Sequence, residues 1–130
     1  MPNNRILEWF RFADADFATA EFLLNMHPQP LEQICYHCQQ SAEKSLKAYL
    51  CANDIEVPKI HEVGVLCNQC SELNPNFTDL IKICEILEIY ATHTRYPNRI
   101  EVTEHDAKQA LEQASAVYNF VAELLKTTSD

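Results

Sequence analysis

The fold is decided by residues 31–50, LEQICYHCQQSAEKSLKAYL. Apolar or small side chains recur there at steps of three or four residues, at Leu31, Cys35, Cys38, Ala42, Leu46 and Tyr49. This period matches the turn of an α-helix and gives the helix one apolar face. The preceding HPQP, residues 27–30, ends one helix and opens the next, because proline suits a first helical turn but not an interior. The stretch therefore predicts a long amphipathic helix.

The same spacing continues on both sides of this helix. The first segment has it at Ile6, Phe10, Ala13, Phe17, Ala20 and Leu24, and the last at Ala107, Leu111, Ala114, Tyr118, Val121 and Leu125. A short helix is predicted at about residues 61–71, and NPNF at 74–77 introduces another helix, with its stripe at Leu80, Ile83, Leu87 and Tyr90. Pro97 disfavours the helical state for Tyr96, so that helix should end near Arg95. Thr103 and Asp106 resemble a capping pair for the last helix.

Long helices joined by short breaks predict an all-α fold, an up-and-down antiparallel bundle of four to five helices. Gly64 is the only glycine, which disfavours sheets because their tight turns depend on glycine. With no repeat or linker, we expect a single domain over residues 1–130. The last helix has a second apolar line at Ala110, Val117 and Leu124, beside Phe120. We interpret this as surplus apolar surface and predict a homodimer.

Composition narrows the possible functions. The net charge of -9 disfavours broad binding to nucleic acid, which needs a lysine and arginine footprint, so any RNA or nucleotide contact should be local. No apolar run has the length of about 18 residues that a membrane span needs. MPNNRILEWFRFADADF, at the start, has acidic residues where a signal peptide would be apolar. We therefore expect a cytoplasmic protein with free thiols and no membrane contact.

Two CxxC units, CYHC at 35–38 and CNQC at 67–70, have the pattern of a four-thiolate zinc site. The alternative is that each cysteine is a small hydrophobe on a helical stripe. Zinc knuckles bend the chain tightly, commonly beside glycine, and neither unit has a glycine within it. We favour core filling and expect neither a metal nor a cofactor.

Charged residues on the predicted helices have ordinary interpretations. Asp14 and Asp16 are two positions apart, so they point away from each other and do not form a paired-carboxylate site. Glu43 stands four residues before Lys47, the favourable order for an ion pair on a helix surface. Lys44 and Lys47 are accordingly expected on a solvated face.

The break between the last two helices, ATHTRYPNRIEVTEHDAKQA at 91–110, gathers His93, Arg95, Tyr96, Arg99 and His105. A histidine can transfer protons near neutral pH, and an arginine can stabilise a phosphate that gains charge. Arg99 and His105 could therefore cleave RNA without a metal, by helping the 2′-hydroxyl to attack the adjacent phosphorus. One histidine cannot easily make both proton transfers, so a second copy from a dimer partner would help.

Four stretches together resemble the HEPN domain: ADADFATAEFLL, CYHCQQSAEKSLKAYL, His61 and YATHTRYP. They are most similar to the branch with a QQAAEKALKA-like second helix and an arginine-tyrosine-proline motif, over about residues 5–126. The resemblance implies a helical bundle that commonly dimerises. It also implies a minimal nucleotidyltransferase partner, often in a two-gene toxin-antitoxin module. Many family members are metal-independent RNases with an arginine, four to six residues and a histidine, a spacing that Arg99 and His105 satisfy.

The residues that match the pattern of this branch are Asp16, Lys44, Lys47, His61, Arg95 and Tyr96. We expect several of them to converge, with Asp16 holding Arg95 by a charge-assisted bond. Such a cluster could bind a nucleotide phosphate, or it could be a structural tie, since buried ionic groups persist only when paired.

The sequence thus predicts a nucleotide- or RNA-binding HEPN protein that works beside a nucleotidyltransferase. One alternative is an RNase that uses Arg99 and His105. Another is a non-catalytic interaction module whose acidic surface docks on a basic partner.

Overall fold

The computed structural model describes residues 4–92 and 101–128. Its elements are α1 (Asn4–Leu23), α2 (Leu31–Ala52), α3 (Val63–Leu73), a 3-10 segment η1 (Pro75–Leu80), α4 (Ile81–Thr92) and α5 (Glu104–Thr128). Within those two ranges the structure has no strand, so the predicted all-α class and the number of helices are confirmed. No helix in the same ranges is both long and apolar enough to cross a membrane.

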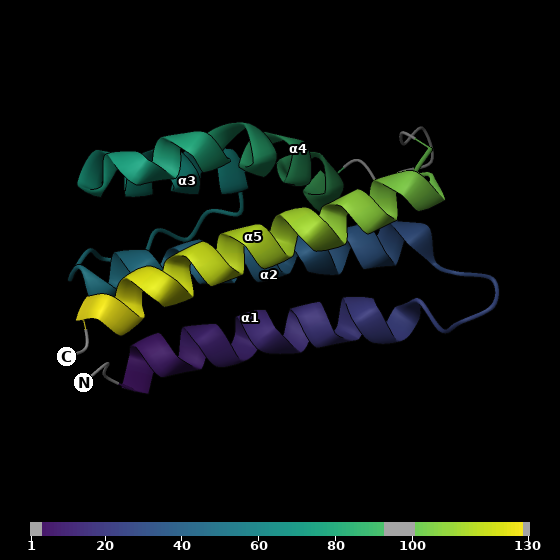
Figure 1. The fold of residues 1–130 in the computed structure, drawn as a ribbon, viewed down its shortest axis with the longest axis horizontal. Helices are drawn as coiled ribbons and strands as arrows, with labels where there is room; N and C mark the ends of the chain where they lie inside the picture. Colours follow the sequence, from purple (N-terminus) through teal and green to yellow (C-terminus); the bar gives the residue numbers. More distant parts are fainter. Residues whose placement is uncertain (1–3, 93–100, 129–130) are drawn as a thin grey trace.

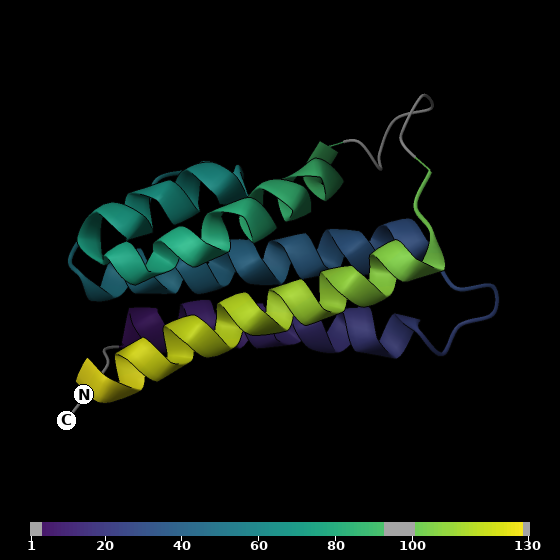
Figure 2. The same cartoon turned by 45° about the horizontal axis from the view of Figure 1, so that its top comes forward.

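The three longest helices lie side by side along the long axis of the molecule (Figure 1). α1 runs antiparallel to α2, and α5 runs in the same direction as α2. α3 and α4 form a hairpin that covers α2 on the side away from α1, as the turned view confirms (Figure 2). α2 therefore contacts all four of the other α-helices.

The central position of α2 explains its burial. Every residue from Ser41 to Leu50 is buried except Lys44, including the polar residues of that stretch. The apolar stripe predicted the side that faces the core. It did not predict that the opposite side is covered as well, which happens because α1 and the segment after α2 also pack there. Polar side chains on α2 must consequently find partners inside the protein.

The second apolar line of α5 is covered within the chain. Ala110 and Val117 are buried, and Leu124 is half-buried against the core. The Phe120 ring packs edge-on against Phe77 of η1, with 4.8 Å between the ring centroids. This line is therefore not surplus surface for a homodimer, and that prediction is wrong, because η1 and the core bury it. The homodimer itself stays a prediction from the family resemblance.

The ends of the helices follow local chemistry. NPNF does not start a helix directly: the Asn74 side chain accepts a hydrogen bond from the Asn76 amide at 3.0 Å, and η1 precedes α4. The predicted helix end near Arg95 lies outside the described residues. At α5 the predicted cap is confirmed: the Asp106 amide donates to Thr103 Oγ1 at 3.1 Å, and the Thr103 amide donates to Asp106 Oδ2 at 3.0 Å.

Removing this cap should destabilise the fold. Thr103→Ala leaves the Asp106 amide without its side-chain acceptor, so we expect a loss of about 1 kcal/mol in the free energy of unfolding, measured by urea denaturation. Thr19→Ala is the matched control, because the Thr19 hydroxyl only bonds the Ala15 carbonyl on the exposed side of α1, at 2.8 Å. Alanine favours a helix interior more than threonine does, so Thr19→Ala should be neutral or slightly stabilising. Equal losses in the two variants would contradict a specific cap.

Candidate functional site

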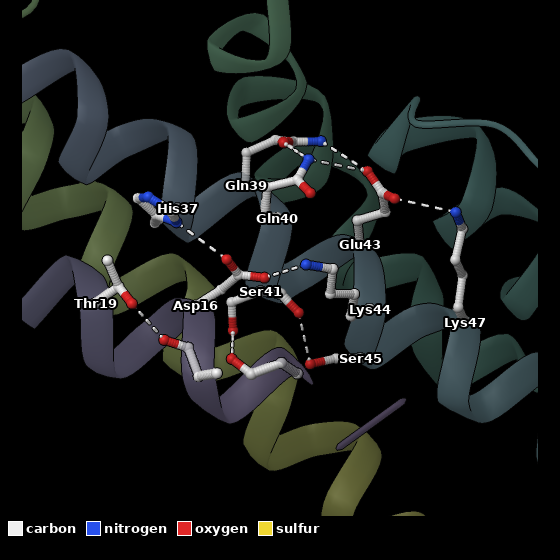
Figure 3. Close-up of polar contacts among 12 residues, drawn as sticks. Asp16, Thr19, His37, Gln39, Gln40, Ser41, Glu43, Lys44, Ser45 and Lys47 are labelled. Atoms are coloured by element: carbon white, nitrogen blue, oxygen red, sulfur yellow. Dashed lines mark hydrogen bonds and ion pairs between the residues drawn. The ribbon is translucent and has the colours of Figure 1, made fainter. Parts of the chain in front are cut away.

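The first polar cluster, the Asp16 cluster, joins α1 to α2 and consists of Asp16, His37 and Lys44. One carboxylate oxygen of Asp16 lies 3.0 Å from His37 Nδ1, and the other accepts a hydrogen bond from Lys44 Nζ (Figure 3). The side chains of the three residues are 14%, 27% and 21% exposed, in that order. This partial burial makes the charged pair stronger than an ion pair in open solvent, where salt and water screen the charges.

Neighbouring contacts reinforce the same junction. The Lys44 ammonium lies 5.9 Å from the ring centroid of Phe12, an exposed aromatic residue of α1, which is a cation–π distance. One turn away, the buried hydroxyl of Ser41 donates to the Ala13 carbonyl at 2.9 Å. α1 is thus held against α2 by polar contacts as well as by apolar packing.

The second polar cluster, the Glu43 cluster, consists of Glu43, Lys47, Gln39, Gln40 and His61. Glu43 Oε2 accepts from Lys47 Nζ at 3.0 Å and lies 3.1 Å from His61 Nδ1. Glu43 Oε1 accepts from the side-chain amides of Gln39 and Gln40, each at 3.3 Å. The side chains of Glu43 and Lys47 are only 4% and 6% exposed. The prediction that Lys47 lies on a solvated face is therefore wrong.

The burial of this ion pair has two visible causes. The segment between α2 and α3 returns over α2, and the Gln39 side chain donates to the His61 carbonyl at 3.0 Å, which fixes the segment there. From α1, the Trp9 ring covers Lys47, with 5.7 Å from Nζ to the ring centroid. The His61 ring itself stays in solvent, since its side chain is 72% exposed. The Glu43 cluster therefore joins α2 to a surface histidine.

Four of the six residues of the branch pattern lie in the described ranges, and they divide between the two clusters. Lys44 joins Asp16, whereas Lys47 and His61 join Glu43. Arg95 and Tyr96 lie outside the described residues, so the expected bond between Asp16 and Arg95 stays a prediction. Sequence reasoning missed His37 and Gln39. For Gln39 a signal was available, because Gln39 and Glu43 are four residues apart and so lie on one helix face.

Asp14 and Asp16 face different helices. Asp14 is hydrogen-bonded to Tyr118 of α5, and burial together with this bond raises the pKa of Tyr118 to about 12. Asp16, two positions later, faces α2. The structure thus agrees with the prediction that these aspartates do not form a paired site.

Of the predicted catalytic pair, Arg99 lies outside the described residues. His105 is exposed in the first turn of α5, where solvent and solutes can reach its ring. The RNase hypothesis therefore stays a prediction.

The cysteines of both CxxC units are fully buried, in α2 and α3. Burial, with the nearby charge of Asp106, raises the pKa of the Cys35 thiol to about 12, and burial also raises the pKa values of Cys38 and Cys70. Such thiols behave as small apolar side chains, in agreement with the core-filling interpretation. Among the residues of the two described ranges, no three His, Cys, Asp or Glu side chains are placed to hold a metal ion.

A family model described as "HEPN domain" matches residues 6–124. The chain belongs to the HEPN family. The match covers all five helices of the structure almost completely, so the resemblance expected from the sequence is confirmed.

Similar proteins of known name or structure support the assignment to the HEPN family. The Methanocaldococcus jannaschii protein named "Putative toxin MJ1304" is 30% identical over 129 aligned positions, which cover 88% of this chain and 84% of that protein. The crystal structure of TT1696 from Thermus thermophilus has a TM-score of 0.79 and 26% identity, covering 93% of this chain and 98% of that one. ST0689, described as an archaeal HEPN homologue, has a TM-score of 0.73 and 25% identity, covering 92% and 96%.

The Glu43 cluster generates a stability prediction for this HEPN domain. Lys47→Met leaves the Glu43 carboxylate buried without its cation, so we expect a loss of about 3 kcal/mol in the free energy of unfolding, measured by urea denaturation. Combining Lys47→Met with Glu43→Gln removes the unpaired charge and should recover more than half of that loss. Lys44→Met is the matched control and should cost only about 1 kcal/mol, because its partner Asp16 reaches solvent. A double variant no more stable than Lys47→Met would contradict a charge-based role.

Proposed function

We propose that this HEPN domain is the helical component of a toxin-antitoxin-like module, that it works with a minimal nucleotidyltransferase, and that it contributes a nucleotide- or RNA-binding surface. The proposal is supported by family membership and by the similarity to the protein named as a toxin. We also propose, from the family resemblance, that the domain acts as a homodimer.

The observation that carries the binding surface is the pairing of lysines with aromatic rings where α1 meets α2. Lys44, whose side chain is 21% exposed, lies beside the exposed ring of Phe12, whereas the buried Lys47 holds the half-buried ring of Trp9 in place. Proteins that bind single-stranded nucleic acid or nucleotides combine aromatic stacking with cationic groups in this way. In a chain with a net charge of -9, such a surface favours local contact over binding along a nucleic-acid backbone. We propose that Arg95, Tyr96 and the exposed His61 extend it.

The proposed partnership predicts a stable complex with the product of a neighbouring gene. Co-expression of the chain with an adjacent small nucleotidyltransferase should give one complex that elutes together in size-exclusion chromatography at micromolar concentration. Expressed alone, each protein should elute later than the complex, and this chain should elute as a dimer. Separate elution of the two proteins after co-expression would contradict the partnership.

A second candidate, a metal-independent RNase, is favoured by the exposure of His105 six positions after Arg99. If His105 is the general acid and base, His105→Ala should reduce RNA cleavage in EDTA by at least about 100-fold. His27→Ala removes an exposed histidine from the turn between α1 and α2, so it should leave cleavage unchanged. Full cleavage by His105→Ala would exclude this candidate.

A nucleotide titration distinguishes the third candidate, a non-catalytic interaction module, from a nucleotide binder and from an RNase. A nucleotide binder should show a raised melting temperature with nucleotide, and Arg95→Ala should remove that shift. An interaction module should form the complex with its partner while showing neither cleavage nor a nucleotide-dependent shift.

A further inference from the structure

A hollow of about 600 Å³ opens where the first turns of α1, the last turns of α2 and the segment after α2 come together. Its wall includes Arg5 and Trp9 from α1, Lys47 and Cys51 from α2, and Lys59 from the following segment. This volume is within the range of about 300–1,000 Å³ that is usual for small-molecule sites. It contains three of the chain's ten basic residues.

The wall combines a stacking surface with free cations. Trp9 is half-buried, and the buried Lys47 beneath it is neutralised by Glu43, so Lys47 fixes the ring in place more than it attracts a ligand. Arg5 and Lys59 are both exposed, and neither forms an ion pair with any residue in the described ranges. These two side chains are therefore available to bind an anionic group.

Two acidic residues, Asp54 and Glu56, also line the hollow, and both are exposed. A simple anion would be repelled by them, whereas a ligand that has hydroxyl donors as well as an anion would satisfy both kinds of group. A flat ring, hydroxyl donors and a phosphate occur together in a nucleotide.

We infer that this hollow binds a mononucleotide, with its base against Trp9, its phosphate near Arg5 and Lys59, and its ribose hydroxyls toward Asp54 and Glu56. The inference rests on the proposed nucleotide- or RNA-binding function and places that ligand at the hollow.

Two side chains in the wall of the hollow, Trp9 and Cys51, can report the binding of a ligand there. Trp9 is the only tryptophan of the chain. Cys51 is half-buried, whereas the other five cysteines are buried. Titration with adenosine monophosphate should therefore quench the tryptophan fluorescence in a saturable way, after correction with free N-acetyltryptophanamide. It should also slow the reaction of Cys51 with a disulfide reagent several-fold in the folded protein.

A pair of matched variants tests whether the rim cations hold the phosphate. Lys59→Gln should weaken the binding of adenosine monophosphate roughly tenfold, because a charge-assisted hydrogen bond is lost. Lys108→Gln makes the same change at an exposed position of α5 and should leave the affinity unchanged. Equal weakening in both variants would indicate unspecific electrostatic attraction and overturn the inference.

Calorimetry with the same nucleotide separates this inference from the proposed function. Heat of binding without quenching of Trp9 and without protection of Cys51 would place the ligand elsewhere, which overturns the inference and leaves nucleotide binding intact. No heat of binding at millimolar nucleotide would overturn the inference, and a complex with RNA in that case would keep the proposed function. Quenching, protection and the effect of Lys59→Gln together would support the hollow as the site.

Discussion

A carboxylate buried in the middle of a helical bundle is the constraint on which the rest of this structure depends. Removing Glu43 from water costs several kcal/mol unless its oxygens are fully compensated. Lys47, Gln39, Gln40 and His61 provide that compensation. Because these partners come from α2 and from the segment that follows it, satisfying one carboxylate also fixes the path of the chain from α2 toward α3. The hollow beside Trp9 is formed by that path.

The same constraint orders the α1 side of the molecule. Lys47, held by Glu43, supports the Trp9 ring, while Lys44, three residues earlier on α2, is held by Asp16 of α1. The two lysines are thus fixed by different carboxylates and face different surroundings. Polar contacts of this kind specify how α1 sits on α2, since apolar packing alone tolerates shifts of one helix along another. If the proposed binding surface is built on these fixed side chains, it needs little reordering when a ligand arrives.

The helices could be predicted because their signals are local. Apolar spacing, the prolines around residue 30 and the cap at Thr103 each act within a few residues. The failures are contacts between distant segments. Glu43 and Lys47 look like a surface pair in the sequence, and only the return of the segment that ends at His61 buries them. The second apolar line of α5 looked unpartnered for the same reason, since Phe77, 43 residues before Phe120, packs on it.

For the candidate site, the sequence selected most of the residues and the pair of Glu43 with Lys47, but not the other partners. Lys44 lies with Asp16 as expected of neighbouring charges, whereas His37 was not considered, because 21 residues separate it from Asp16. The partner of Lys47 and His61 is Glu43, which the resemblance did not include among the functional residues. Residue types and spacing indicate which side chains carry chemistry, and tertiary packing decides which of them meet.

The most direct test of the account is the NMR signal of the Lys47 side-chain ammonium at neutral pH. A buried ammonium held by Glu43 and covered by Trp9 exchanges its protons slowly with water, so it should give a resolved signal, assigned by its loss in Lys47→Met. The signal should disappear by fast exchange in Glu43→Gln. A Lys47 ammonium that exchanges as fast as exposed Lys108, or one unaffected by Glu43→Gln, would contradict the buried ion pair at the centre of this account.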